Sequence, residues 1–303
     1  MKSEIVQLNA DFTCTGRCAG CSRYFDCTDP RREEMFHDRY YAMLEERMMG
    51  IGCKIAIMSG KGGVGKSMLT ANLGVCLAKM GYQVGVVDFS GSCIPSLLGV
   101  RGEKLIWDWK AGIQPVVNPQ GVHVISLGFV LENKEALIWD ETMRRDMIKQ
   151  FLTHVDWGKL DYLIIDLPPG TGAESIATIQ YMPNLDGAVV VTIPSVMAQE
   201  VARKSITLCR KADIPVLGVV ENMSYFICPS CSESHELFEG GGGALIADEM
   251  QVDLLGKIPM DPLVSVKSDQ GIPFISECNN NHVTKSFAKI VESILTNVSR
   301  LHT

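Results

Sequence analysis

A glycine-rich stretch between two apolar patterns constrains the fold of this chain more than any other feature. After an apolar run and before a helical one, the chain reads Gly60, Lys61, Gly62, Gly63, Val64, Gly65, Lys66 and Ser67. Glycines let successive backbone N–H groups turn toward one anion, and a helix that begins there adds its partial positive charge. A glycine-rich turn without a ligand is the alternative, but every position of a phosphate-binding loop is filled.

The two residues that end this loop predict its chemistry. We expect Lys66 to contact the β- and γ-phosphates of a nucleotide, and the hydroxyl of Ser67 to ligate Mg²⁺. Asp166 ends another apolar run, and an acidic residue at that place can hold the Mg²⁺ shell.

Short apolar runs alternate with helical patterns from Cys53 onward, which is typical of βαβ units and a parallel sheet. The runs predict strands at 54–58, 83–88, 122–127, 162–166, 188–193, 216–221 and 254–258, and helices at about 66–80, 141–154, 174–181, 196–212, 243–250 and 283–301. We therefore predict a three-layer α/β P-loop NTPase fold. The last helix carries a wide apolar stripe, for which packing on the sheet is favoured over a membrane surface because its polar face mixes both charges.

Composition excludes several classes of protein. The 303 residues include 28 basic and 35 acidic ones, a net charge of −7, so we expect neither nucleic acid nor an anionic membrane as a partner. No apolar run reaches the roughly 18 residues that cross a bilayer. The chain starts without an apolar leader, so we expect a cytoplasmic protein whose 11 cysteines stay reduced.

The first 38 residues differ from the remainder and predict a cysteine-rich arm, followed by an ATPase domain at 39–303. Four cysteines lie within fourteen residues of the arm: Cys14, Cys18, Cys21 and Cys27. A segment this short gains order mainly from a metal. The spacing indicates a [4Fe-4S] cluster or a zinc site.

A second cysteine pair lies near the end of the chain. Cys228 and Cys231 form a C-x-x-C turn, which is half of a tetrahedral metal site, although a redox pair has the same spacing. His235 is the histidine that we would test as an additional ligand. Single cysteines are expected to be small buried side chains, namely Cys53, Cys76, Cys93, Cys209 and Cys278.

The second lysine of the loop, Lys61, marks a resemblance to the deviant Walker A group of P-loop ATPases, which includes the MinD/ParA and Mrp/ApbC families. The segment from Asp166 to Thr171 resembles the switch II of the Mrp/ApbC family, and Asn222 matches its adenine-contacting position. The resemblance implies a homodimer, or a heteromer with a paralogous ATPase, in which Lys61 reaches the partner's nucleotide. It assigns catalytic roles to Lys61, Lys66, Asp88 and Asp166.

In the same family the C-x-x-C pairs of two subunits bridge one [4Fe-4S] cluster, which implies that Cys228 and Cys231 do so here. The spacing of the arm cysteines resembles the eukaryotic cytosolic iron-sulfur scaffolds of the Nbp35 type, although Cys14 departs from that pattern because the family's first cysteine lies further upstream. The implied function is ATP-dependent assembly and transfer of [4Fe-4S] clusters to cytosolic apoproteins, with ATP, Mg²⁺ and two kinds of cluster site.

One position departs from the family. Ser90 stands where relatives carry a second aspartate after Asp88, and a serine cannot act as a carboxylate base, so we expect weak ATP hydrolysis. Two other functions stay open. One is a MinD/ParA-like positioning ATPase without a cluster, and the other is a regulatory subunit that binds nucleotide and zinc without hydrolysis.

Overall fold

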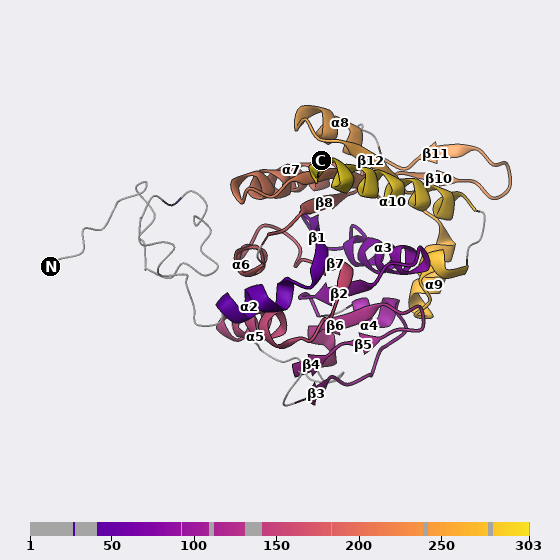
Figure 1. Ribbon diagram of the computed structural model, residues 1–303. Helices are drawn as coiled ribbons and strands as arrows, with labels where there is room; N and C mark the ends of the chain where they lie inside the picture. Colours follow the sequence, from indigo (N-terminus) through magenta and orange to yellow (C-terminus); the bar gives the residue numbers. More distant parts are fainter. Residues whose placement is uncertain are drawn as a thin grey trace.

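The structure is a computed structural model that describes residue 27 and residues 41–91, 93–108, 112–130, 141–182, 184–238, 242–277 and 281–302. Its centre is an eight-stranded sheet with the order β12-β9-β8-β1-β7-β2-β6-β5 (Figure 1). The strands are β1 Ile51–Ser59, β2 Val84–Asp88, β5 Val116–Val117, β6 His123–Ser126, β7 Leu160–Asp166, β8 Gly187–Thr192, β9 Val216–Glu221 and β12 Leu254–Lys257. All neighbours pair in parallel except β5, which runs antiparallel to β6.

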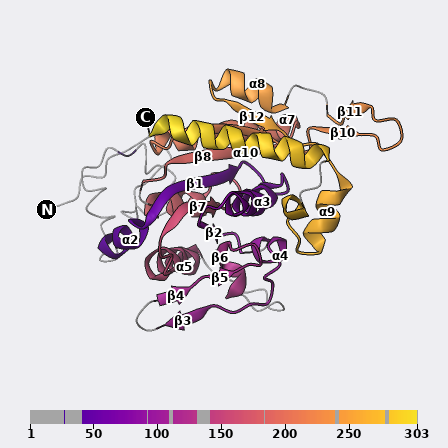
Figure 2. The ribbon, with the colours of Figure 1, turned by 45° about the vertical axis from the view of Figure 1, so that its right-hand side comes forward.

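Helices cover both faces of the sheet and complete three layers (Figures 1 and 2). One face carries α2 Tyr41–Met48, α5 Glu141–His154, α6 Ala173–Tyr181, α7 Val196–Lys211 and α8 Gly242–Glu249. The other face carries α3 Lys66–Lys79, α4 Ile94–Leu97, α9 Pro262–Asp269 and α10 His282–Leu301. The central strand β1 shows why both layers are needed, since Ala56 and Met58 pack toward the first group while Ile55 and Ile57 pack toward the second.

The predicted three-layer fold is confirmed, and each predicted strand and helix has an observed counterpart with slightly different ends. Several short elements were not predicted: a hairpin of β3 Ile106–Asp108 with β4 Gly112–Gln114, a hairpin of β10 Tyr225–Ile227 with β11 Ser234–Glu236, strand β5, helices α4 and α9, and two 3₁₀ turns at Leu127–Phe129 and Phe274–Glu277. Strand β11 reads Ser, His and Glu and has no apolar pattern, and β3 has only three residues, too few for a pattern to be recognised.

The last helix packs on the sheet, as its apolar stripe predicted. Helix α10 lies along β12 and β9, and it buries Val283, Phe287, Ile290, Val291, Ile294 and Val298. In the part of the chain that the structure describes, no helix is long and apolar enough to cross a lipid bilayer.

The single cysteines divide into two groups. Cys53 and Cys209 are buried as predicted, and burial raises the pKa of each thiol to about 12. The prediction is wrong for Cys93, which is exposed because it caps the start of α4 at the surface, and Cys76 is half-buried. Cys278 lies outside the described residues.

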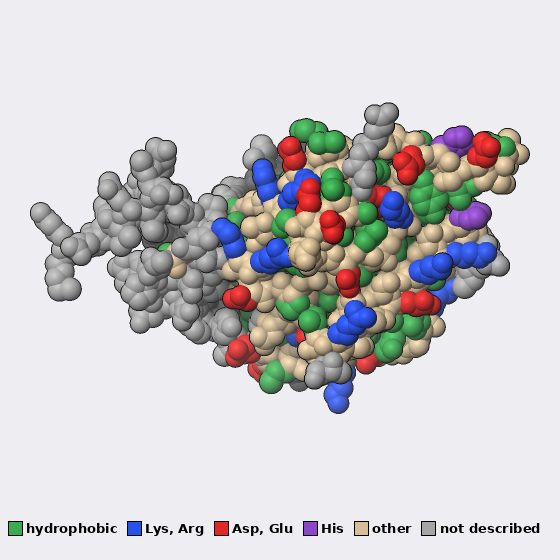
Figure 3. All heavy atoms as spheres, turned by 90° about the horizontal axis from the view of Figure 1, so that it is seen from above, with side chains coloured by type: hydrophobic (Ala, Val, Ile, Leu, Met, Phe, Trp, Pro, Cys, Tyr) green, Lys and Arg blue, Asp and Glu red, His purple; other side chains and the backbone are tan. Residues whose placement is uncertain are grey.

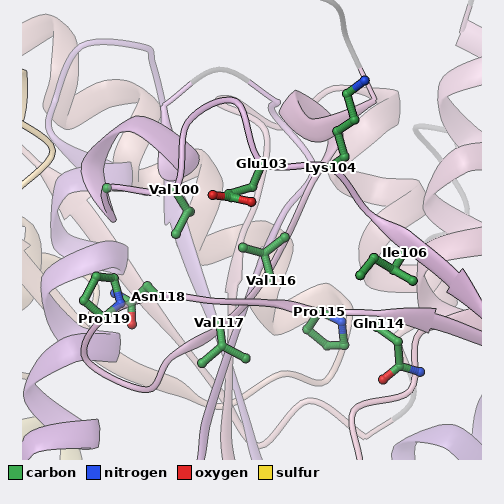
Figure 4. Close-up of a pocket in the computed structure, with 11 residues that line it drawn as sticks. Val100, Glu103, Lys104, Ile106, Gln114, Pro115, Val116, Val117, Asn118 and Pro119 are labelled. Carbon is green, nitrogen blue, oxygen red and sulfur yellow. The ribbon is translucent and has the colours of Figure 1, made fainter.

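A hollow of about 490 Å³ lies at the β5 edge of the sheet. In Figure 4, Val116 and Val117 of this edge strand lie on one side of the hollow, and Val100 and Glu103 of the loop after α4 lie on the other. Strands β7, β2 and β6 separate β5 from β1. The hollow is therefore remote from the glycine-rich loop that follows β1.

One of the contacts that hold α10 to the molecule is aromatic, and it can be tested. Phe287 is fully buried, and its ring lies edge to face on Phe274 with centroids 5.3 Å apart. We expect Phe287→Ala to lower the free energy of unfolding by about 3–5 kcal/mol through the cavity that it leaves. The matched control is the half-exposed Phe238, where Phe238→Ala should change the value by less than about 0.5 kcal/mol. Equal losses in denaturant titrations would contradict the packing described.

Candidate functional site

The glycine-rich loop connects the carboxyl end of β1 to the first turn of α3, and its glycines are needed for two different reasons. Gly63 and Gly65 have φ values of 81° and 87°, which side chains rarely adopt. A Cβ atom at Gly65 would lie 2.1 Å from the amide nitrogen of Asn222, and one at Gly60 would lie 2.5 Å from Val201 of α7. At Gly62 a Cβ would meet nothing within 4 Å, so this side of the loop is open.

A buried ion pair lies beneath the loop. The ammonium of Lys66 is 2.6 Å from Oδ2 of Asp166, and the side chains are 7% and 0% exposed. Apart from this ion pair, the ammonium finds no hydrogen-bond acceptor among the described residues. A buried cation beside an open cradle of glycines is the donor set that a chain of phosphates requires, so the residues present fit a nucleotide.

Asp166 is held by two hydroxyl groups as well as by Lys66. Ser67 donates to its Oδ2 at 2.7 Å, and Thr70 donates to its Oδ1 at 2.6 Å. Burial raises the pKa of Asp166 and the neighbouring Asp88 adds to this, whereas Lys66 opposes it. The contact between Ser67 and Asp166 places the predicted Mg²⁺ ligand beside the carboxylate that was predicted to hold the Mg²⁺ shell.

Asp88 ends β2, directly beside Asp166 in the register of the two strands. Its Oδ1 accepts hydrogen bonds from the backbone N–H groups of Ser90 and Gly91 at 2.8 and 3.0 Å, and from the hydroxyl of Ser90 at 2.6 Å. Its Oδ2 accepts from Ser126 at 2.8 Å. Ser90 therefore turns back onto Asp88, and its hydroxyl caps the end of the strand.

The segment predicted as switch II lies against the start of the loop. The N–H of Leu167 donates to the carbonyl of Ile57, and that of Gly170 donates to the carbonyl of Ser59 at 2.7 Å. The hydroxyl of Ser175 in α6 donates to the carbonyls of Pro168 and Gly170. Any displacement of this turn would therefore be felt both by the last residues of β1 and by α6.

Asn222 contacts the loop directly. Its side-chain amide donates to the carbonyl of Val64 at 2.9 Å, and the residue is 4% exposed. The contact with adenine that the resemblance implied stays a prediction. What the structure adds is that Asn222 holds the backbone of the phosphate loop itself.

Sequence reasoning missed Glu221, the buried neighbour of Asn222. One of its carboxylate oxygens accepts from the hydroxyl of Ser224 and lies 3.6 Å from the ammonium of Lys257, and the other accepts from the N–H of Gly243 in α8. A carboxylate near a helix N-terminus is favourable. The signal that could have revealed it is an acidic residue at the end of an apolar strand, the same pattern that pointed to Asp166.

The C-x-x-C pair forms the turn between β10 and β11, a hairpin that projects from the end of the sheet where β9 finishes (Figure 1). The N–H of Cys228 donates to the carbonyl of Glu233 at 2.9 Å, and the N–H of Ser232 donates to the carbonyl of Cys228 at 2.8 Å. Hydrogen bonds from the backbone N–H groups of Cys231 and Ser230 lower the pKa of the Cys228 thiol. A thiol that is easily deprotonated is a better metal ligand.

The remaining predicted site residues are Lys61 and the four cysteines of the arm. Lys61 is half-exposed in the loop, where its carbonyl accepts from the hydroxyl of Ser59. Of the four arm cysteines the structure describes Cys27 alone, and Cys14, Cys18 and Cys21 lie outside the described residues. The structure thus brings together Lys66, Ser67, Asp166 and Asp88, with Asn222 on the other side of the loop.

Comparison with known proteins decides the family. A family model described as NUBPL iron-transfer P-loop NTPase matches residues 50–295. The chain belongs to this family. The matched residues include the phosphate loop, switch II, Asn222 and the C-x-x-C hairpin, so the resemblance to Mrp/ApbC-type P-loop ATPases is confirmed.

Several similar proteins bear the name iron-sulfur cluster carrier protein. The one from Methanococcus maripaludis is 40% identical over 291 residues, which cover 95% of this chain and 98% of the relative. The one from Saccharolobus solfataricus is 43% identical over 255 residues, which cover 83% and 86%.

Solved structures of the family's fold agree with the architecture. A nucleotide-binding protein from Archaeoglobus fulgidus in complex with ADP is 39% identical, with a TM-score of 0.68 over 77% of this chain and 92% of that one. The cell division ATPase MinD from Pyrococcus furiosus is 25% identical, with a TM-score of 0.59 over 81% and 99%. The predicted mostly parallel P-loop NTPase fold is thus confirmed by its neighbours as well.

The geometry of the loop predicts different roles for its two lysines. Lys66→Ala should abolish measurable ATP binding in titration calorimetry, because it removes the buried cation at the phosphates. Lys61→Ala should leave the affinity of a single chain nearly unchanged, because this half-exposed side chain is expected to reach the nucleotide of a partner subunit. Because Lys66→Ala removes the ion pair of the buried Asp166, a circular dichroism spectrum must show that the variant is still folded. Unchanged ATP affinity in a folded Lys66→Ala protein would refute the assigned site.

Proposed function

We propose that this protein binds Mg-ATP and carries a [4Fe-4S] cluster that Cys228 and Cys231 of two copies hold between them, for delivery to cytosolic apoproteins. The family and the names of its relatives support iron-sulfur transport. The observation that carries the proposal is a chain of hydrogen bonds that connects the phosphate loop to the cysteine hairpin. This connection would let the nucleotide influence how the cluster is held.

The connection consists of a few consecutive residues. The side-chain amide of Asn222 donates to the carbonyl of Val64 in the loop, and two residues later the hydroxyl of Ser224 donates to the carboxylate of Glu221. The N–H of Ser224 donates to the carbonyl of Ile258 at 3.0 Å. From there the chain enters β10, and Cys228 directly follows that strand.

The hairpin itself is attached to the segment after β12. The N–H of Met260 donates to the carbonyl of Tyr225 at 2.7 Å, and Phe226 and Met260 form an isolated parallel bridge. The hairpin is thus anchored at its base, while its turn projects from the sheet. A projecting pair of thiols suits a site that is shared with a second molecule.

The number of ligands supports a shared cluster. One chain supplies two thiolates at the hairpin, and a [4Fe-4S] cluster takes four. Two copies, or one copy and a paralogous chain, supply the complete set. We also propose that residues 1–38 form a separate arm whose cysteines hold a second cluster, and that residues 39–303 form the ATPase domain.

The residues of the nucleotide site suggest how a bound nucleotide acts. The N–H groups of the open loop and the ammonium of Lys66 would bind the phosphates, and Ser67 would hold Mg²⁺, which neutralises phosphate charge when bound. The ammonium of Lys66 would then interact with the phosphates as well as with Asp166, so its ion pair with Asp166 would weaken. Asp166 and the turn up to Gly170 are one continuous segment, so this change is passed to switch II.

Ser90 favours a second candidate, a subunit that binds nucleotide with little hydrolysis. The hydroxyl of Ser90 is engaged with Asp88, which is itself saturated with hydrogen bonds. Neither group is thereby set up as a base for water. The function of a MinD-type positioning ATPase is compatible with the fold, but it does not account for the cysteine hairpin.

Removal of the hairpin thiols tests the proposed cluster. Cys228→Ser should lose the bridging cluster, because in a symmetric site it removes two of the four thiolates, while the arm cluster remains. Iron and sulfide analysis of anaerobically reconstituted protein measures the loss. The matched control is the exposed Cys93, and Cys93→Ser should keep the full iron content. The proposal fails if Cys228→Ser with Cys231→Ser keeps all its iron while Cys18→Ser with Cys21→Ser loses all of it.

Hydrolysis tests the role of Ser90. A missing positioning group commonly costs about 10²- to 10⁴-fold in rate, so we expect wild-type turnover barely above the Lys66→Ala background. Ser90→Asp should raise turnover, because it restores the carboxylate that relatives carry at this position. Ser90→Ala, which lacks a carboxylate, is the control and should stay low. Rapid wild-type turnover that none of the Ser90 variants alters would show that another group does this work.

A further inference from the structure

The hairpin carries ligand side chains beyond the C-x-x-C pair. Cys231, Glu233 and His235 place a thiol sulfur, a carboxylate oxygen and a ring nitrogen within 4.8 Å of one another, and all three residues are exposed. Figure 3 shows histidine and acidic side chains next to one another at the end of the molecule that the hairpin forms. Nothing in the bridging cluster requires the last two residues.

The backbone of the hairpin creates this group. His235 pairs with Phe226 in the register of β10 and β11. Glu233 stands just before β11, and its carbonyl accepts from the N–H of Cys228, which continues the pairing and puts its side chain on the same face as His235. The turn is closed by the hydrogen bond from Ser232 to Cys228, with Ser232 in the left-handed region at φ 61°. This turn brings Cys231 back over that face.

The spacing suits a metal ion. The sulfur of Cys231 lies 3.8 Å from Oε2 of Glu233. In a tetrahedral site with bonds of about 2.3 Å to sulfur and 2.0 Å to oxygen, these two ligand atoms are about 3.5 Å apart. A thiolate and a carboxylate neutralise a divalent cation, and the neutral imidazole completes a set typical of zinc or ferrous iron.

We propose that each hairpin binds a single divalent transition-metal ion, Zn²⁺ or Fe²⁺, through Cys231, Glu233 and His235 of one chain. This site needs no second copy, so it does not rest on the proposed shared cluster. Because Cys231 belongs to both sets of ligands, the ion and the bridging cluster exclude one another. A chain loaded with the single ion is then unable to share a cluster until the ion leaves.

Cobalt titration of the full-length chain tests the proposal. Co²⁺ is the probe, because a bond to thiolate gives it a charge-transfer absorption band. Cys18→Ser with Cys21→Ser is the background, so that the arm thiolates do not compete. We expect one Co²⁺ per chain with this band, at the same stoichiometry in dilute and concentrated protein. Glu233→Gln and His235→Asn should each weaken binding about tenfold or more, and Cys231→Ser should remove the band.

The chain offers a matched control for each of the two substitutions. Glu236→Gln changes the carboxylate on the opposite face of the strand, and His282→Asn changes an exposed histidine elsewhere, so both should bind Co²⁺ as the background protein does. Cys228→Ser should keep the cobalt site although it loses the bridging cluster, which separates the two proposals. A cobalt band that depends on Cys228 and ignores both Glu233→Gln and His235→Asn would overturn the inference, as would the absence of a thiolate band.

Discussion

The buried ion pair between Lys66 and Asp166 is the contact on which the nucleotide site depends. Lys66 begins α3 and Asp166 ends β7, so the pair joins the helix of the phosphate loop to the strand that leads into switch II. Removing one partner of such a buried pair commonly costs about 3–5 kcal/mol, because the other charge is left without compensation. The hydroxyls of Ser67 and Thr70 occupy the carboxylate further, which keeps the loop in a defined position before any phosphate arrives.

The two carboxylates at this edge of the sheet are compensated in different ways. Asp166 faces a full positive charge, whereas Asp88 is satisfied by hydroxyl and backbone donors. Both are fully buried, and their strands are neighbours, so a cation at Lys66 lowers the cost of having two acids side by side. The same arrangement explains the position of Ser90, whose hydroxyl is one of the donors that Asp88 needs.

Much of the fold and of the loop could be predicted because their signals are local. Buried parallel strands read as continuous apolar runs, and the glycines with Lys66 and Ser67 are consecutive in sequence. The two strands of the cysteine hairpin could not be predicted, because the residues of β11 are exposed and the base of the hairpin is fixed by a hydrogen bond from Met260, which is distant in sequence. The contact of Asn222 with Val64 could not be predicted either, because no local sequence pattern indicates which backbone carbonyl a side chain distant in sequence will contact.

The route between the loop and the hairpin limits what a nucleotide can do to the cysteines. A ligand shifts a conformational equilibrium only by the difference in its affinity for the two states. Asn222 touches the loop and lies shortly before the hairpin, so a change in the loop can reach the hairpin through this side chain. Glu221 is tied to Ser224 and to Gly243, so the same displacement would also pull on α8. The cysteine turn and α8 should therefore move together, since one buried carboxylate joins them.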